Sequence, residues 1–443
     1  MAEDIATTRL VESPEEALSP RELRLEHGGA VLRWGAIINT GLTVVVFVLA
    51  LLGGLRVIPN LFPTLHNLLL GRVGVADDAA VAQVILLLQL DVSFLLVMAV
   101  GVLAREVWAL AGVWVLALIN IGAIVFLGFT PAIVTVVAAV WAGIIVSRDM
   151  KAFRVNPVML KELRGRMRGV RAFVVLSVYL GLMSAFLALL YLIYEPINQR
   201  SGSAAAGEVG RVLFMGIVGI ELMLIIFIAP AFTAGAITGE RERLTYDLLK
   251  TTLLASPSFV IGKLESALGY VLLLLLSAIP LQSIAFLFGG VTELELILSL
   301  VILAVTAIAL GTVGIYFSAT ATRTLAASVR AYTTTLVTTF GVPLVLAVIV
   351  NVLSVTLRGM SSTIEAILIY LNDFLTSLNP IATALATQQL LIQQRGFGFW
   401  TDTLRDGTTI PRVSPWITFT IIYLVVSTVL VVLSIQRTRK IEQ

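Results

Sequence analysis

The sequence predicts an all-α integral membrane protein, a polytopic bundle with about ten transmembrane helices. Of its 443 residues, 58% are hydrophobic and only 13% are charged, whereas a soluble domain has about 25% charged residues. The apolar residues also fall into runs of the length, about 20 residues, that a helix needs to cross about 30 Å of hydrocarbon. So few charges cannot cover a water-facing surface of this size, so lipid must surround most of the chain.

Ten apolar runs are separated by polar or Gly/Pro-containing connections. The fourth run is short, but it is counted as a separate span because residues 107–147 are too long for one crossing. Gly128-Phe129-Thr130-Pro131 supplies the break between the two. The predicted spans are 34–55, 82–104, 107–127, 130–147, 172–194, 212–238, 259–288, 294–318, 331–356 and 416–435.

The distribution of Lys and Arg sets the orientation of these spans. If the N-terminus is cytoplasmic and the spans alternate, 22 of the 30 Lys and Arg residues lie on the cytoplasmic side. Short cytoplasmic loops carry such an excess of positive charge. We therefore expect both ends of the chain in the cytoplasm, and we attribute the pI near 9.2 to topology rather than to nucleic-acid binding.

The chain divides by charge and apolar content into four predicted regions. These are a cytoplasmic tail (1–33), an N-terminal membrane region of four spans (34–147), a basic block (148–171) and a six-span core (172–443). The core contains a charged cytoplasmic loop at 239–258 and a long outer loop at 357–415. No internal repeat joins these regions.

The basic block is predicted to contain an amphipathic connecting helix at the inner membrane surface. Asn156 can cap this helix, and Pro157 suits its first turn. Apolar side chains recur on one face and cations on the others, which is typical of an interfacial helix. The simpler alternative is a positive juxtamembrane stretch attracted to anionic lipid. The apolar face comprises Met159, Leu160, Leu163, Met167 and Val170, and the polar faces carry Lys161, Glu162, Arg164 and Arg168.

The outer loop is predicted to be helical in two places. Ser362-Thr363-Ile364-Glu365 matches a capping box and precedes an apolar stripe that runs to Leu378. Asn379-Pro380 is expected to start a second helix, which continues to about Gln394. A stripe this broad should not face water, so we expect both helices to rest on the outer mouth of the bundle.

Several catalytic signatures are missing from the chain. There is no H-E-x-x-H, no G-x-S-x-G and no cysteine. There is also no Walker A motif, because Gly262-Lys263 is followed by Leu264 and lacks the preceding glycine. We therefore do not expect an enzyme. The remaining classes are a channel, a secondary transporter, a scaffold, or a subunit driven by a separate ATPase.

The 239–258 loop favours the last of these classes. Four charges of both signs, from Glu240 to Arg243, are followed by Leu248 and Leu249. A solvated turn needs no such leucines, whereas a short docking helix uses charges for register and leucines for buried area. The predicted docking residues are Glu240, Arg241, Glu242, Arg243, Thr245, Leu248 and Leu249.

The stretch from 230 to 263 resembles the signature of the ABC-2 type ABC transporter permeases. The residues that carry the resemblance are Pro230-Ala231, Ile237-Thr238-Gly239-Glu240-Arg241-Glu242, Thr245, Leu248-Leu249, Thr251-Thr252 and Gly262-Lys263. Asn156-Pro157 through Arg168 is similar to the family's connecting helix, and Leu378-Asn379-Pro380 to its outer helices. The resemblance covers roughly 156–440, about two thirds of the chain. Leu244 stands where a glycine is common and Leu253 where a proline is common, and the four spans at 34–147 are extra.

The resemblance implies the transmembrane subunit of an exporter in a prokaryotic plasma membrane. Two permease subunits, identical or different, would pair in the lipid. ATPase subunits would bind the coupling helix in the 239–258 loop and would hold the ATP and Mg²⁺, so this chain itself needs no cofactor. The transported substrate is not implied.

Two carboxylates lie within predicted spans, Asp91 and Glu221. A charge in hydrocarbon costs several kcal/mol, so such a group faces protein or water. One interpretation is a substrate or proton path, which would suit a secondary transporter that needs no ATP. The other is an interhelical hydrogen bond, with Gln89, Asn39, Asn120 or Gln282 as partners.

Overall fold

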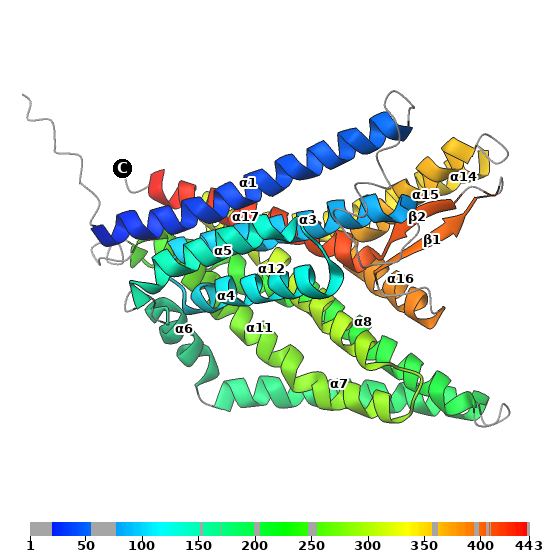
Figure 1. Cartoon of the computed structure of the whole chain (residues 1–443). Helices are drawn as coiled ribbons and strands as arrows, with labels where there is room; N and C mark the ends of the chain where they lie inside the picture. The colour runs from blue at the N-terminus through cyan, green and yellow to red at the C-terminus, as the bar shows by residue number, and fades with distance from the viewer. Residues whose placement is uncertain are drawn as a thin grey trace, which may run out of the picture.

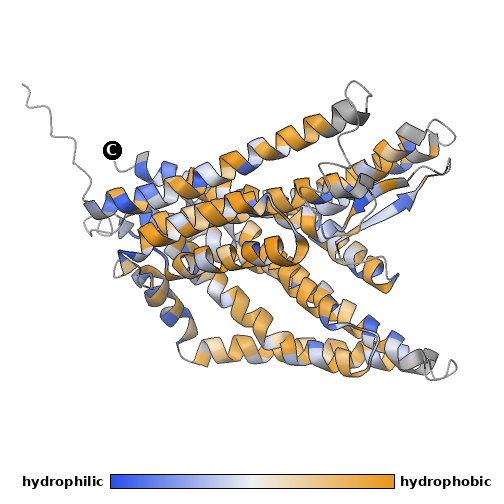
Figure 2. Ribbon diagram, viewed as in Figure 1, coloured by the Kyte–Doolittle hydropathy of each residue, from blue (hydrophilic) through white to orange (hydrophobic). Residues whose placement is uncertain are grey.

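A computed structural model gives the fold of this chain. It describes residues 20–54, 77–150, 153, 155–168, 170–198, 204–246, 255–356, 362–393, 398–404, 407 and 409–440. In the part of the chain that it describes, nine helices are long and apolar enough to cross a membrane. Apolar residues make up most of their length, and polar residues are more frequent toward the two ends of the bundle (Figure 2). The protein is therefore a multi-pass helical membrane protein.

The N-terminal membrane region consists of four helices that pack around two apolar clusters, the larger of which contains Leu25 and Leu32. They are α1 (Pro20–Gly54), α3 (Asp77–Leu103), α4 (Val107–Gly122), which a π-helical turn extends through Leu127, and α5 (Ala132–Ser147). Gly128 ends the π-helical turn in the left-handed conformation, with a φ of 70°, at the predicted break. The fourth predicted span is thus a separate helix, but it has only 16 residues.

Helix α1 begins at Pro20 and continues without a break into the first span. Leu25 and Leu32 are buried in the larger apolar cluster of the region. Residues 20–33 of the predicted tail are therefore helical and are packed on the N-terminal region. Residues 1–19 lie outside the described residues.

The core follows a connecting helix, α6 (Pro157–Met167), and its central helices are α8 and α12. Helix α12 packs against α8 on one side and α17 on another, whereas α7 packs mainly on α8. Helix α17 also packs against α3, which joins the core to the N-terminal region. The core elements are α7 (Val170–Asn198), α8 (Ala204–Ala234), α9 (Thr238–Glu242), α11 (Ser256–Leu287), α12 (Glu293–Thr320), α13 (Thr324–Leu336), a π-helical turn (Val337–Gly341), α14 (Val342–Thr356) and α17 (Pro415–Lys440).

The 357–415 loop contains the two predicted helices, α15 (Ser362–Ser377) and α16 (Pro380–Ile392). Asn379 caps α16 by accepting from the backbone N–H of Ile381 at 2.8 Å. The loop also contains a hairpin that we did not predict, formed by antiparallel strands β1 (Phe399–Thr403) and β2 (Thr409–Val413). Arg412 anchors the hairpin to α15, because its guanidinium donates to the carboxylate of Asp373 at 2.9 Å through Nε.

The two ends of the bundle differ in what they carry. Helix α6, the start of α1 and the end of α17 lie together at one end, and the hairpin with α15 and α16 lies at the other (Figure 1). We call these the α6 end and the hairpin end. The α6 end contains the charged loop after α8, and the candidate site is built there.

Candidate functional site

One buried lysine joins three segments at the α6 end. The Nζ of Lys263, in the second turn of α11, lies 2.7 Å from Oε1 of Glu240 in α9. It also forms an ion pair with Glu162 of α6. The lysine side chain is only 4% exposed, whereas the two carboxylates are about one quarter and one fifth exposed. We call Glu162, Glu240 and Lys263 the lysine cluster.

The surroundings of the lysine cluster hold its members in place. The hydroxyl of Ser266 donates to Glu162 Oε2 at 2.8 Å, and Thr245 donates to the carboxylate of Glu240. A buried ammonium is costly unless it is paired and hydrogen-bonded. Arg166 supplies a second cation, since its guanidinium lies 3.9 Å from Glu162 Oε2. Both carboxylates are also partly exposed, so water can solvate them.

Asn156 forms a second junction next to the lysine cluster. Its Oδ1 accepts from the backbone N–H of Val158 at 3.0 Å, so it caps α6, and Pro157 occupies the first turn as predicted. Its Nδ2 donates to Glu106 Oε1 at 2.7 Å and to the carbonyl of Ser258 at 2.6 Å. The cap therefore ties α6 to the α3–α4 connection and to the first turn of α11.

Glu106 is the N-terminal-region partner in this junction. Burial raises the pKa of the Glu106 carboxyl, and the hydrogen bond from Asn156 opposes that rise. The side chain of Glu106 is 3% exposed. Further contacts connect the same regions, because Ser258 Oγ donates to the carbonyl of Ala104 at 2.8 Å and Trp108 Nε1 donates to Glu265 at 2.6 Å.

The charges of the predicted docking motif also have partners within the chain. Arg241 donates to the carbonyls of Ala319 and Ala321 at 3.2 and 3.0 Å, at the end of α12. Glu242 accepts from the backbone and the hydroxyl of Thr324, both at 2.8 Å. Together with Glu240, these residues hold α9 against α11 and the α12–α13 connection.

Two neighbouring residues of the motif face outward instead. Arg243 is exposed, and Leu244 is 78% exposed with a φ of 58°. Only glycine adopts this left-handed conformation without cost, which gives a physical reason why a glycine suits the position of Leu244. Leu248 and Leu249 lie outside the described residues.

The remaining residues of the connecting helix divide between packing and solvent. Leu163 faces α11 near Gly269, so part of the predicted apolar stripe is used to pack α6 onto the core. Lys161, Arg164 and Arg168 are exposed. They form the cationic side of α6 that the sequence predicts.

Asp91 and Glu221 lie in separate places and share no partner among the described residues. Both oxygens of Asp91 accept, from Asn120 Nδ2 at 3.1 Å and from Thr135 Oγ1 at 2.9 Å. Glu221 is fully buried and accepts from Gln282 Nε2 at 2.7 Å, while its other oxygen has no partner in the described part of the chain. The predicted interhelical partners Asn120 and Gln282 are thus the observed ones.

Comparison with models of known protein families and with curated proteins finds no match for this chain. The resemblance to ABC-2 type permeases accordingly rests on the quoted motifs and on the order of the spans.

Sequence reasoning missed the central residue of the site. Lys263 was quoted as part of a motif but not as a site residue, and Glu106 was not singled out. A signal was present, because a lysine inside an otherwise apolar run requires a buried carboxylate partner. The choice between Glu162 and Glu240 could not be made from the sequence, and the structure pairs the lysine with both.

Proposed function

We propose that this chain is the transmembrane permease subunit of an ABC-2 type ABC transporter, an exporter driven by a separate ATPase. The observation that carries the proposal is the lysine cluster. It ties the connecting helix α6 and the α9 loop to α11 through one buried ammonium. The resemblance independently assigns α6 as the connecting helix and the α9 loop as the coupling segment.

The contacts at the α6 end suggest how force from an ATPase would travel. Helix α9 follows α8 after a three-residue turn, and Glu240 links it to Lys263 of α11. Arg241 and Glu242 link it to the α12–α13 connection. A push on the α9 loop would therefore move α8, α11 and α12 together rather than bend a free loop.

These contacts refine which residues would touch the ATPase. Glu240, Arg241 and Glu242 are engaged within the chain, so we assign them to holding the loop. Arg243 and Leu244 are exposed and would provide the contact, with Leu248 and Leu249 beyond them. The positive charge of Arg243 suits an acidic surface on the partner.

A second permease subunit would pair in the membrane along exposed apolar helices. Helix α7 exposes Phe173 by 72% and Leu182 by 68%, and α14 exposes Leu344 by 68%. Lipid also fits such surfaces. We therefore propose the pairing of two permease subunits on the basis of the family resemblance.

The alternative is a secondary transporter that uses Asp91 and Glu221. One observation favours a role for Glu221, since one of its oxygens has no partner among the described residues. Asp91 has both oxygens satisfied by neutral donors, which suits a packing role. Transport driven by a proton gradient alone, and lost in Glu221→Gln, would support this alternative over the first proposal.

The gene neighbourhood gives the first test, because the proposal predicts an adjacent gene for an ATPase with a Walker A motif. The decisive experiment is co-expression with such an ATPase, followed by purification through a tag on the permease. We expect a stable complex whose ATPase activity is coupled to the permease. Arg243→Glu combined with Leu244→Asp should abolish co-purification without changing membrane insertion.

The matched control for this experiment is Arg437→Glu. Arg437 is exposed near the end of α17, at the same end of the bundle as α6. Like Arg243→Glu, this substitution replaces an arginine by a glutamate on the proposed cytoplasmic side, but it lies away from the α9 loop. If both variants retain the ATPase, or if both lose it, the docking assignment is wrong.

A further inference from the structure

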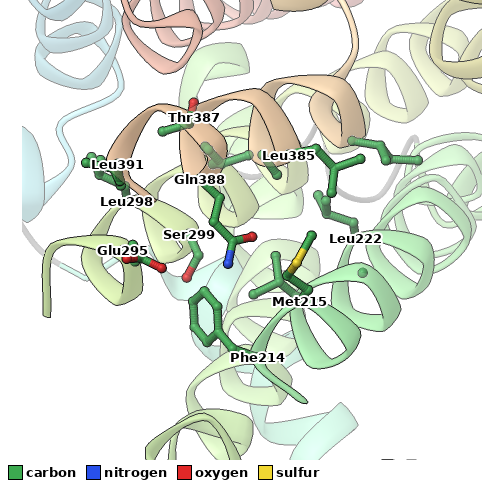
Figure 3. Close-up of a pocket in the computed structure, with 15 residues that line it drawn as sticks. Phe214, Met215, Leu222, Glu295, Leu298, Ser299, Leu385, Thr387, Gln388 and Leu391 are labelled. Atoms are coloured by element: carbon green, nitrogen blue, oxygen red, sulfur yellow. The ribbon is translucent and has the colours of Figure 1, made fainter. Parts of the chain in front are cut away.

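A pocket at the hairpin end of the core is separate from the lysine cluster. It lies between α8, the first turns of α12, and α16 (Figure 3). Its walls are mostly apolar, with Phe214, Leu222, Leu298 and Leu385 among the lining side chains. The cavity measures about 60 Å³, which is room for a few water molecules or for one small polar head group.

Three buried polar atoms beside this pocket have no hydrogen-bond partner among the described residues. They are Glu295 Oε2, Thr387 Oγ1 and Gln388 Nε2. Glu295 is 5% exposed and Gln388 is 9% exposed. An unpaired polar atom in an apolar environment costs roughly 1–3 kcal/mol. Figure 3 shows the Thr387 hydroxyl directed away from the Gln388 amide, so the atoms that call for an explanation in this pocket are Glu295 Oε2 and Gln388 Nε2.

Thr292 sets the orientation of the Glu295 side chain. The hydroxyl of Thr292 donates to Glu295 Oε1 at 3.2 Å, and Thr292 also caps α12 through the backbone N–H of Glu295 at 3.3 Å. Oε1 is thereby occupied and Oε2 is left over. Figure 3 shows the amide of Gln388 directed between Ser299 and Met215, above the ring of Phe214.

The unpaired atoms Glu295 Oε2 and Gln388 Nε2 indicate the chemistry of a ligand that would fit the pocket. A carboxylate oxygen requires a donor, and a charged donor gives the strongest bond. The amide Nε2 of Gln388 requires an acceptor close to that donor. The apolar walls above and below favour a hydrocarbon attached to the polar head, and the small volume restricts the head to an unsubstituted amine.

We propose that this pocket binds a primary ammonium group that carries a neighbouring hydrogen-bond acceptor and an apolar chain. The ammonium pairs with Glu295 Oε2, and the acceptor receives the hydrogen bond from Gln388 Nε2. The chain leaves along the apolar side chains of α8 and α16. A transported amphiphilic amine and an ethanolamine lipid both have this chemistry. The inference concerns binding and does not depend on the proposed ATPase partner.

The test uses the full chain in nanodiscs of phosphatidylcholine, with decylamine as the probe and the midpoint of thermal unfolding as the readout. We expect saturable stabilisation of the wild type. Glu295→Gln keeps the shape of the side chain and the Thr292 contact but removes the charge, so it should weaken decylamine binding by at least about tenfold. Gln388→Leu should leave decylamine binding unchanged, because decylamine has no acceptor for Gln388 Nε2. The same variant should weaken the binding of 1-aminodecan-2-ol, whose hydroxyl lies beside the ammonium and can accept from Nε2.

Matched controls separate the pocket from general partitioning of a cation into the bilayer. Glu208→Gln removes an exposed carboxylate of α8 outside the pocket and should bind like the wild type. Decyltrimethylammonium, which has no N–H donor, should not stabilise. The proposal fails if Glu295→Gln binds decylamine as the wild type does, if the trimethylated probe is equivalent, or if no saturable binding occurs and the pocket holds water only.

A second arm distinguishes the two sources of the ammonium. Nanodiscs that contain phosphatidylethanolamine should weaken decylamine binding if the lipid head group competes for the pocket. Unchanged binding in these discs would assign the pocket to a soluble or transported amine. Each result supports the ammonium chemistry and selects its source.

Discussion

Asp91 and Lys263 are both ionisable and almost fully buried, but one has neutral partners and the other has charged partners. Asp91 accepts hydrogen bonds from the neutral side chains of Asn120 and Thr135. Thr135 in turn accepts from Asn39, so the network unites α1, α3, α4 and α5. Lys263 is instead paired with two carboxylates, one from α6 and one from α9.

We attribute the Asp91 network to helix packing, and the lysine cluster to coupling between α6, the α9 loop and α11. The Asp91 network holds together four helices that are consecutive in the described sequence. The lysine cluster joins α11 to α9, where Glu240 lies 23 residues before Lys263, and to α6, which is about 100 residues away in the sequence. Loss of a hydrogen bond in the Asp91 network should therefore affect only the N-terminal region. Loss of an ion pair in the lysine cluster should release α6 and the α9 loop from the core.

The largest effect is expected for Lys263→Met. It leaves Glu162 and Glu240 near each other without their cation, and removal of one partner from a buried ion pair costs about 3–5 kcal/mol. We expect the lower part of that range, because both carboxylates are partly exposed. Tryptophan fluorescence during thermal unfolding in detergent measures the loss.

The triple variant Glu162→Gln, Lys263→Met and Glu240→Gln is the control for that prediction. It removes all three charges and should recover much of the lost stability, since no buried charge is left unpaired. If the triple variant is as unstable as Lys263→Met, the loss comes from packing rather than from charge.

The second-largest effect is expected for Gly262→Ala in α11, and Gly269 of the same helix serves as the comparison. A Cβ at Gly262 would lie 2.6 Å from Oδ1 of Asn156, and Asn156 cannot move aside because its hydrogen bonds to Val158, Glu106 and Ser258 hold it. We expect Gly262→Ala to destabilise by about 1–3 kcal/mol, as measured by the unfolding midpoint.

Gly269→Ala is the matched control on the same helix. Its Cβ would meet Leu163 at 3.5 Å, an ordinary van der Waals distance. Alanine is favoured over glycine inside a helix by about 1 kcal/mol, so this variant should be neutral or stabilised. Equal losses in the two variants would show that close packing around Asn156 is not the cause.

A smaller loss, of about 1 kcal/mol, is expected for Asp91→Asn. The new amide retains one acceptor for Asn120 or Thr135, and interhelical hydrogen bonds in membrane proteins contribute about 0.6 kcal/mol on average. Under the proposed permease function, ATP-driven transport should persist. A complete loss of transport with an unchanged unfolding midpoint would instead place Asp91 on a translocation or proton path.

The smallest effect concerns Glu106 and depends on pH. Burial raises its pKa in the folded state, so the folded protein binds more protons than the unfolded chain and stability falls as pH rises through that interval. Glu106→Gln keeps an acceptor for Asn156 and should remove this loss. We expect equal unfolding midpoints at acid pH and a slightly higher midpoint for the variant at alkaline pH, whereas a pH-independent difference would exclude titration of Glu106.

Local signals in the sequence predicted most of the helices and several of their ends. Asn156-Pro157 and Asn379-Pro380 predict the starts of α6 and α16, and the structure has both caps. The hairpin at 399–413 was missed, although Trp400 and Ile410 are buried residues of strand-forming types. The prediction ended the second outer helix at about Gln394 and assigned no secondary structure to the rest of the loop, where the two short strands lie.

The candidate site was less predictable, because its contacts cross the chain. The pairing of Lys263 with Glu162 depends on how α6 packs on α11, which no spacing in the sequence encodes. Glu240, Arg241 and Glu242 were predicted as docking residues because a run of charges of both signs precedes leucines in a predicted cytoplasmic loop. Contacts with Thr324 and with carbonyls at the end of α12 engage them within the chain, and only a three-dimensional arrangement reveals such partners.

The shortness of α5 has a consequence for the surrounding lipid. Its 16 residues span about 24 Å at 1.5 Å per residue, against about 30 Å of hydrocarbon. Ile133, Val137, Trp141 and Ile144 are exposed along its outer face, so this flank meets acyl chains directly. The bilayer must become thinner there to match the helix, and shorter or more disordered acyl chains should collect along α5, which gives the protein one flank with its own lipid composition.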